Sequence, residues 1–351
     1  MIYKRFLEIC LYLLKTFQKY LNYQQKQILF QKKEMIKDQF TFLSSNGKTN
    51  IHSISCVPKD GKFIGIFQII HGMYEYIERY LTFIEYLTSK GFIVVGHDLL
   101  GHGESINDKE DLGYFGEPDP LEFLIKDIHT LRTMTQKKYE NIPYFMCGHS
   151  FGSYLLRTYI TMHSQGLGGA ILLGSGYSDP CTSLISINLC KFISCFKGSH
   201  HRSRFIKKLS MEMGPYRKYD MTKKDLNNSW ISRDPEVVKI YNSDKKCDFE
   251  FTLNGFIGVA LSIQYCCNPT NVAKVKKDLP ILFISGDCDP VGNNGEGVKK
   301  SYEIMKTVGS LDVTFKLYEN MRHEVLNELN KNEVYEYIYS WLKDKLSAFV
   351  K

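Results

Sequence analysis

Short apolar runs alternate with helical patterns over most of this chain. The runs typical of buried strands cover residues 64–70, 92–95, 144–147, 169–173, 281–285 and 313–318. Helical patterns at residues 80–89, 121–137 and 150–162 lie between most of them. The alternation predicts an α/β fold with a mostly parallel central sheet and helices on both faces. Ligand sites in such a sheet lie at the carboxyl ends of its strands.

The stretch FMCGHSFGSYLL, residues 145–156, passes from one of these runs into a helical pattern. Ser150 therefore lies at a strand-to-helix junction, between Gly148 and Gly152. Two glycines remove the side chains that would clash there, so the serine can adopt a strained, exposed turn. The N-terminus of the following helix favours negative charge beside the serine. A glycine-rich turn with a helix-capping serine is the alternative, and the rest of the chain has to distinguish the two.

The segment IIHGMYEY, residues 69–76, ends another predicted strand. Its loop can offer the backbone N–H of Met73 to a substrate oxygen, and the N–H of Phe151 can offer a second donor. Two such donors form an oxyanion hole, in which one donor stabilises the transition state by about 3 to 4 kcal/mol. We expect His71 to brace this loop rather than to act as a base.

The segment ISGDCDPVGNNG, residues 284–295, offers a carboxylate for a catalytic histidine. Both Asp287 and Asp289 follow a predicted strand. Asp289 is favoured because Pro290 restrains it to an extended conformation and a turn glycine stands three residues before it. A calcium loop is the rival interpretation, but Val291 and Val298 stand where further oxygen ligands are needed.

The segment YENMRHEVLNE, residues 318–328, places His323 in the loop after the last predicted strand. This histidine lies downstream of the candidate aspartate, where the base of a triad is expected. His97 and His102, in GHDLLGHGES, are expected to brace a tight turn. His149 flanks the serine and is expected to point away from it.

The order Ser150, Asp289, His323 is that of the α/β-hydrolase plan. Five segments together resemble the monoglyceride lipase and lysophospholipase branch of the α/β-hydrolases, which is similar to the serine aminopeptidases: HGMYEYIERY, GHDLLGHGES, GHSFGS, SGDCDPVG and YENMRHEVLNE. The resemblance runs from about residue 40 to the C-terminus. It implies Ser150 as nucleophile, Asp289 and His323 as its partners, Met73 and Phe151 as oxyanion donors, and no metal or organic cofactor. Tyr76 departs from the family, which usually has a histidine there.

Four segments are expected along the chain. An amphipathic N-terminal extension covers residues 1–39, and an α/β core covers 40–175, opening with a hairpin at 40–43 and 51–57. A helical cap covers 176–277, and the core resumes at 278–351. The cap joins apolar residues to a basic run, residues 197–208. This pairing predicts hydrolysis of single-chain lipid esters, monoacylglycerols or lysophospholipids. A peptidase, a general carboxylesterase or thioesterase of the same fold, and a non-enzymatic binding protein remain alternatives.

Composition limits the partners and the compartment. The net charge of +7 is spread along the chain without an aromatic and basic nucleic-acid signature, so no nucleic-acid partner is expected. The ten cysteines form no spaced framework and no zinc pattern, which favours free thiols in the cytoplasm. The N-terminal helix, with its basic flanks, can lie on a membrane surface or pack against the protein body.

Overall fold

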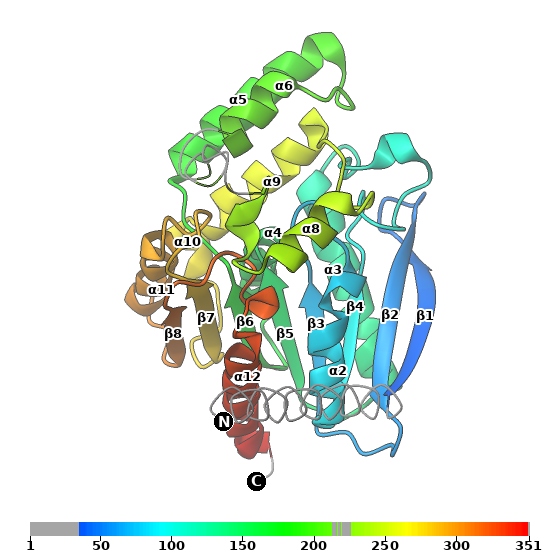
Figure 1. Ribbon diagram of the computed structural model, residues 1–351, viewed down its shortest axis with the longest axis vertical. Helices are drawn as coiled ribbons and strands as arrows, with labels where there is room; N and C mark the ends of the chain where they lie inside the picture. The colour runs from blue at the N-terminus through cyan, green and yellow to red at the C-terminus, as the bar shows by residue number, and fades with distance from the viewer. Residues whose placement is uncertain (1–34, 213–215, 217–218, 220–225, 350–351) are drawn as a thin grey trace, which may run out of the picture.

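The computed structural model describes residues 35–212, 216, 219 and 226–349, and its core is one eight-stranded sheet (Figure 1). The spatial order is β1-β2-β4-β3-β5-β6-β7-β8. The strands are β1 (Met35–Leu43), β2 (Asn50–Pro58), β3 (Gly65–Ile70), β4 (Phe92–His97), β5 (Tyr144–His149), β6 (Leu167–Leu173), β7 (Ile281–Gly286) and β8 (Val313–Tyr318). Strands β3 to β8 pair in parallel with one another, whereas β2 pairs antiparallel with both β1 and β4. The predicted fold class is confirmed.

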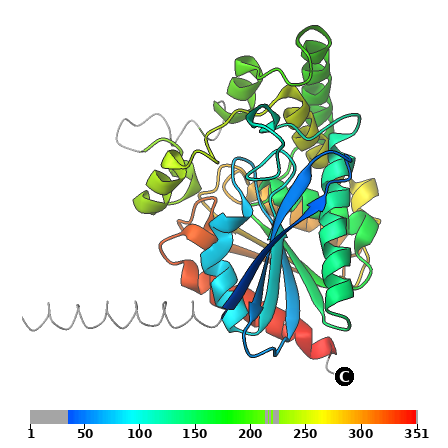
Figure 2. The ribbon, with the colours of Figure 1, turned by 90° about the vertical axis from the view of Figure 1, so that its right-hand side faces the viewer.

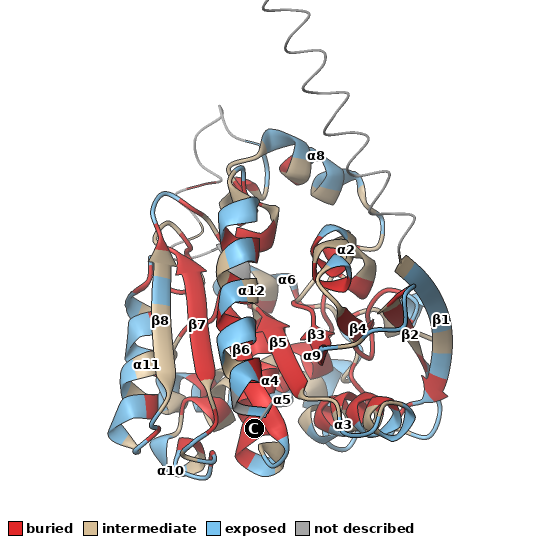
Figure 3. Cartoon of the chain, turned by 90° about the horizontal axis from the view of Figure 1, so that it is seen from below, coloured by how far each residue is buried: buried red, intermediate tan, exposed pale blue. Residues whose placement is uncertain are grey.

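Alternate residues of the central strands face two separate cores. In β5, Tyr144 and Met146 join the core that also holds α3 (Pro120–Lys138), α4 (Phe151–His163) and α11 (Glu296–Thr307). Phe145 and Cys147 join the core on the other face, with α2 (Leu81–Ser89) and α12 (Lys331–Leu346). Because both faces are covered, the middle strands are wholly buried, as Figure 3 shows, and read as continuous apolar runs.

Several helices begin at an Asp-Pro or Asn-Pro pair. The Asp119 carboxylate accepts hydrogen bonds from the backbone amides of Leu121 and Glu122, and Pro120 occupies the first turn of α3, where its missing N–H is not needed. The same arrangement starts α5 (Pro180–Lys197), α8 (Pro235–Ser243) and α10 (Pro269–Val272). These caps fix helix starts locally, within a few residues of the sequence.

The N-terminal hairpin is longer than predicted. Strand β1 begins at Met35 rather than at residue 40, and it pairs with β2 from Met35 opposite Pro58 to Leu43 opposite Asn50. Residues 36–39 are exposed on this edge strand, and the polar run of Lys37, Asp38 and Gln39 hid the strand in the sequence pattern. Residues 35–39 thus belong to the sheet, and the rest of the expected N-terminal extension lies outside the described residues.

The chain leaves the sheet after β6 and returns to it at β7. Residues 174–280, here called the insertion, contain α5, α6 (Arg204–Lys207), the short helix η4 (Ser229–Ile231), α8, α9 (Leu253–Cys266) and α10. Figures 1 and 2 show α5 and α6 at one end of the molecule, above the sheet, and Figure 1 shows α8 lower down. Helix α9 contacts α5 as well as α3 and α4. None of the helices in the described part of the chain is long and apolar enough to cross a bilayer.

Candidate active site

Ser150 occupies a strained turn between β5 and α4. Its backbone has φ 52° and ψ −119°, a conformation that residues other than glycine rarely adopt. The turn needs a close approach of the strand, the helix and the neighbouring loop, and this approach is possible because glycines stand at the contact points. A Cβ on Gly152 would stand 2.1 Å from the carbonyl oxygen of Ile70, and one on Gly148 would stand 2.3 Å from that of Gly152.

The loop after β3 lies against this serine. A Cβ on Gly72 would stand 2.9 Å from the Cβ of Ser150, so only glycine permits the approach. Met73 and Phe151, the expected oxyanion donors, both line the cavity that Ser150 lines. His71 holds the loop: its Nδ1 donates to the Gly72 carbonyl at 2.8 Å, and its Nε2 accepts from the Leu99 amide at 2.8 Å. Burial lowers the pKa of His71, which suits this neutral role.

Asp289 and His323 meet in a buried hydrogen bond. The Nδ1 of His323 lies 2.9 Å from Oδ1 of Asp289, and both side chains are almost inaccessible to water. Burial alone would raise the pKa of the Asp289 carboxyl, but His323, the Ser285 hydroxyl and the Val291 amide outweigh it and hold this pKa below its ordinary value. Asp289 therefore stays ionised beside the imidazole.

The rival carboxylate and the other histidines lie elsewhere. Asp287 is only partly buried, and one of its oxygens has no hydrogen-bond partner among the described residues. Within the described part of the chain, neither ring nitrogen of buried His97 has a hydrogen-bond partner, so His97 makes no hydrogen bond there that would hold the turn. Asp98 holds the turn instead, since its carboxylate accepts from the backbone amides of Ile77 and Glu104 at 2.8 and 2.9 Å.

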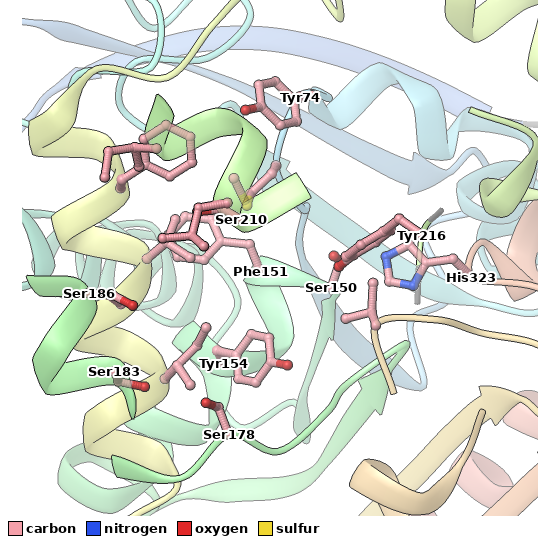
Figure 4. A pocket seen from close by; sticks show the side chains of 18 of the residues that line it. Tyr74, Ser150, Phe151, Tyr154, Ser178, Ser183, Ser186, Ser210, Tyr216 and His323 are labelled. Carbon is pink, nitrogen blue, oxygen red and sulfur yellow. The ribbon is translucent and has the colours of Figure 1, made fainter. Parts of the chain in front are cut away.

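A cavity of about 550 Å³ connects Ser150, His323 and the insertion. Figure 4 shows Ser150 and His323 at one end, with Ser178, Ser183 and Ser186 farther along. The volume falls in the range of small-molecule sites. Its apolar wall comes from α5, α6 and α9, through Ile185, Leu189, Ile206, Phe256, Val259, Ala260 and Ile263.

Only part of the apolar segment in α5 faces this cavity. Ile185 and Leu189 line it, whereas Phe192 and Phe196 are 64% and 75% exposed on the outside of the helix. Helix α9, which the sequence did not single out, supplies more of the wall. Tyr76 is turned toward the insertion, where its hydroxyl donates to Asp244 at 2.7 Å.

A buried charge cluster beside Ser150 was not foreseen. Arg79 donates to Glu75 at 3.0 Å and, through two nitrogens, to both oxygens of Glu324 at 2.8 and 2.9 Å. Glu75 also accepts from the Gly72 amide at 2.5 Å and lies 3.0 Å from Nδ1 of His149. His149 does not simply point away from the site, since its ring also contacts His323, 4.8 Å between centroids.

This charge cluster ties together three segments of the site. Glu75 belongs to the loop after β3, His149 ends β5, and Glu324 follows His323. Burial would lower the pKa of His149, but the Glu75 carboxylate raises it above its ordinary value. The sequence could have indicated the pair of Glu75 and Arg79, because these residues stand four positions apart. It could not have indicated Glu324, because this residue is distant in the chain. In the described residues no group of His, Cys, Asp and Glu is arranged to hold a metal ion.

A strained serine after a parallel strand, near a buried aspartate and histidine and below a helical insertion, is the arrangement of the α/β-hydrolases. The family described as "Serine aminopeptidase, S33" matches residues 61–330, and the chain belongs to this family. The resemblance to monoglyceride lipases is confirmed by their similarity over most of the chain.

Three relatives illustrate this similarity. Mouse monoglyceride lipase is 24% identical over 287 residues, which cover 80% of this chain and 82% of that protein. An uncharacterised abhydrolase domain-containing protein of Dictyostelium discoideum is 26% identical over 288 residues, but the match spans only 27% of its length. The solved structure of a thermostable carboxyl esterase from Bacillus coagulans superposes with a TM-score of 0.80 at 30% identity, over 88% of this chain and 99% of that one.

Proposed function

We propose that this protein hydrolyses carboxylic esters of single-chain lipids, with Ser150, His323 and Asp289 as its catalytic triad. The observation that carries the proposal is the strained Ser150 turn in a cavity that His323 also lines, with His323 bonded to buried Asp289. Lipid ester hydrolysis also agrees with the names of the relatives, a monoglyceride lipase and a carboxyl esterase.

The proposed reaction is acyl transfer through a covalent intermediate. His323 takes the proton of Ser150 as its hydroxyl attacks the ester carbonyl, and Asp289 holds the imidazole tautomer and balances its positive charge. The amides of Met73 and Phe151 receive the negative oxygen of the tetrahedral intermediate. His323 then protonates the leaving alcohol, and water repeats the cycle on the acyl-enzyme. The ionised state of Asp289 supports this role.

The substrate class follows from the lining of the cavity. A wall of aliphatic and aromatic side chains suits an acyl chain, because each buried methylene contributes about 0.8 kcal/mol. The volume of about 550 Å³ suits one chain better than two. We therefore propose monoacylglycerols or lysophospholipids as substrates, and the insertion as a cap that encloses the chain.

The test is kcat/KM across a substrate panel. The panel holds a monoacylglycerol, a lysophospholipid, a diacyl lipid, a short-chain ester, a thioester and an aminoacyl peptide. Fastest turnover of a single-chain lipid is expected. A preference for acetyl esters would overturn the lipid assignment, and fastest turnover of the peptide would overturn the esterase assignment.

A peptidase is the main alternative, because the family itself is described as a serine aminopeptidase. It would use the same triad on an amide. A free substrate amino group would then need a carboxylate that is not already engaged. Among the described residues, the carboxylates that line the cavity are Glu75 and Glu324. Both are bonded to Arg79, which favours the ester.

A further inference from the structure

His323 is covered by a tryptophan that the insertion supplies. The indole of Trp230 lies 5.1 Å from the imidazole of His323 between ring centroids, at an angle of 43°. Trp230 also lines the cavity, and Tyr216 packs edge-on against it at 5.2 Å. Nothing in the triad arrangement requires an aromatic ring at this place.

The backbone fixes this contact. Residues 229–231 of η4 run beside residues 322–324. The amide of His323 donates to the Trp230 carbonyl at 3.4 Å, and the amide of Glu324 donates to the Ile231 carbonyl at 2.7 Å. The Arg322 guanidinium donates to the Ser229 carbonyl at 2.5 Å. The insertion and the histidine loop are therefore joined along their main chains, and these bonds keep the backbone of Trp230 beside that of His323.

The consequence concerns the charge that His323 acquires. In the proposed acyl transfer the imidazole becomes positive at each tetrahedral intermediate, and Asp289 meets only its Nδ1 edge. The electron-rich face of an indole attracts a cation within about 6 Å of the ring centre. A contact that strengthens only when the imidazole is charged stabilises the transition state more than the ground state, so it raises kcat.

We propose that Trp230 is a positioning residue for His323: it orients the imidazole from the side of the insertion and stabilises its protonated form. The inference rests on the proposed function and extends it, because it makes the insertion part of the catalytic apparatus. The other groups that face His323 are Asp289, His149 with Glu75 behind it, and the neighbouring Glu324.

The kinetic test compares Trp230→Leu with Trp230→Phe on a water-soluble ester. Loss of the ring should lower kcat about tenfold with little change in KM, and phenylalanine should restore part of the loss. Trp341→Phe is the matched control, since Trp341 lies in the core around α12 and should tolerate the change with unaltered kcat. A rise in KM at constant kcat would overturn the inference, because Trp230 would then be only a wall of the cavity.

The second readout does not need turnover. The chain has two tryptophans, so Trp341→Phe leaves Trp230 as its single indole. A protonated imidazole in contact with an indole quenches its fluorescence. We expect the indole emission of the Trp341→Phe protein to fall as the pH is lowered. The double variant with His323→Gln should show no such fall, and the double variant with His149→Gln should show the same fall as Trp341→Phe alone. Emission of the Trp341→Phe protein that does not change with pH would overturn the inference.

The two readouts separate this inference from the proposed function. If the proposed triad chemistry fails, the unsubstituted protein hydrolyses no ester, and the fluorescence alone decides about Trp230. If only the lipid preference fails, the unsubstituted protein still hydrolyses the water-soluble ester, and both readouts apply. If the function holds and the inference fails, the parent is active and Trp230→Leu keeps its kcat. If Trp230→Leu does not fold, the kcat of Trp230→Phe and the fluorescence of the Trp341→Phe protein still decide about the role of Trp230.

Discussion

The backbone of Ser150 stores strain that its surroundings have to maintain. A residue with a side chain in this conformation is destabilised by roughly 1 to 3 kcal/mol. The amide of Ser150 donates to the Leu173 carbonyl at 2.9 Å, and the Ser150 carbonyl accepts from the Ser153 hydroxyl at 2.6 Å. These bonds hold the turn from both sides, so the hydroxyl is presented to the cavity without a large conformational change.

Ser150→Ala should remove acyl transfer while the fold persists, because the small side chain makes no bond that holds the turn. We expect a fluorophosphonate to label the parent at Ser150 and kcat of the variant to fall by at least about 10⁴-fold. Mass spectrometry of the labelled protein locates the adduct. Labelling that survives in Ser150→Ala, or an adduct on another residue, would contradict the assignment.

Asp289→Asn and Asp287→Asn form a matched pair. The amide of asparagine cannot balance the imidazolium and favours the wrong tautomer, so Asp289→Asn should lower kcat by about 10³- to 10⁴-fold. Asp287 has no bond to His323, so Asp287→Asn should keep most of the activity. Steady-state kinetics on a soluble ester measures both. The reverse order of the two effects would refute the choice of Asp289.

The elements of the site are held together by the charge cluster rather than by apolar packing alone. Glu75, Arg79 and Glu324 have side chains that are 4%, 10% and 5% exposed. A buried ion pair adds little net stability, but removal of one partner leaves an uncompensated charge. This property makes the cluster testable by substitution.

Arg79→Met should lower the free energy of unfolding by about 3 to 5 kcal/mol, because two buried carboxylates lose their counter-ion. Lys239→Met is the control, since Lys239 pairs with Glu236 on the surface, where the side chains are 58% and 70% exposed. The control should change stability by less than about 1 kcal/mol. Urea titration at neutral pH measures both variants, and equal small effects would argue against a structural role for the cluster.

Glu75 should also shape the acid stability of the protein. Burial raises its pKa, but His149 and Arg79 outweigh burial and hold the pKa of the Glu75 carboxyl well below its ordinary value. Its stabilising effect is therefore fully present above the unfolded pKa, about 4.3, and is lost as the pH falls below that value. Urea midpoints of Glu75→Gln should fall less than those of the parent between pH 5 and pH 3. Parallel pH profiles would contradict this.

At the scale of the whole molecule, two parts of the insertion differ in their contacts: residues 229–233 and helix α5. Residues 229–233 bond directly to the loop 322–328, as in the pair of Arg233 with Glu328 at 2.9 Å. Helix α5 instead carries exposed Phe192 and Phe196 on its outer side. Both parts line the cavity, through Trp230 and Ile231 on one side and through residues of α5 such as Ile185 and Leu189 on the other.

Deletion of residues 1–34 should leave the sheet complete, because β1 begins at Met35. We expect kcat/KM on a soluble ester to stay within about twofold of the parent. We also propose that the basic, amphipathic N-terminal segment contacts anionic membrane surfaces, so the deletion should lower binding to phosphatidylserine vesicles. Co-sedimentation measures binding, and unchanged binding would place the membrane contact elsewhere.

Much of the architecture could be predicted from the sequence, because its determinants are local. Continuous apolar runs predicted the buried strands, and Asp-Pro pairs mark helix starts within a few residues. The glycines around Ser150 predicted the turn, since backbone clearance depends on neighbouring residues. Strand β1 was predicted too short because an edge strand exposes polar residues that carry no apolar pattern.

Tertiary structure alone decided which distant side chains meet. The bonds of Arg79 to Glu324 cross 245 positions, and neither residue carries a local signal of the other. The same holds for Trp230, whose indole packs on His323. Such contacts depend on how the insertion and the loops pack over the sheet. Periodicity therefore determines the elements, while the partners of buried charges and rings emerge only when the elements are brought together.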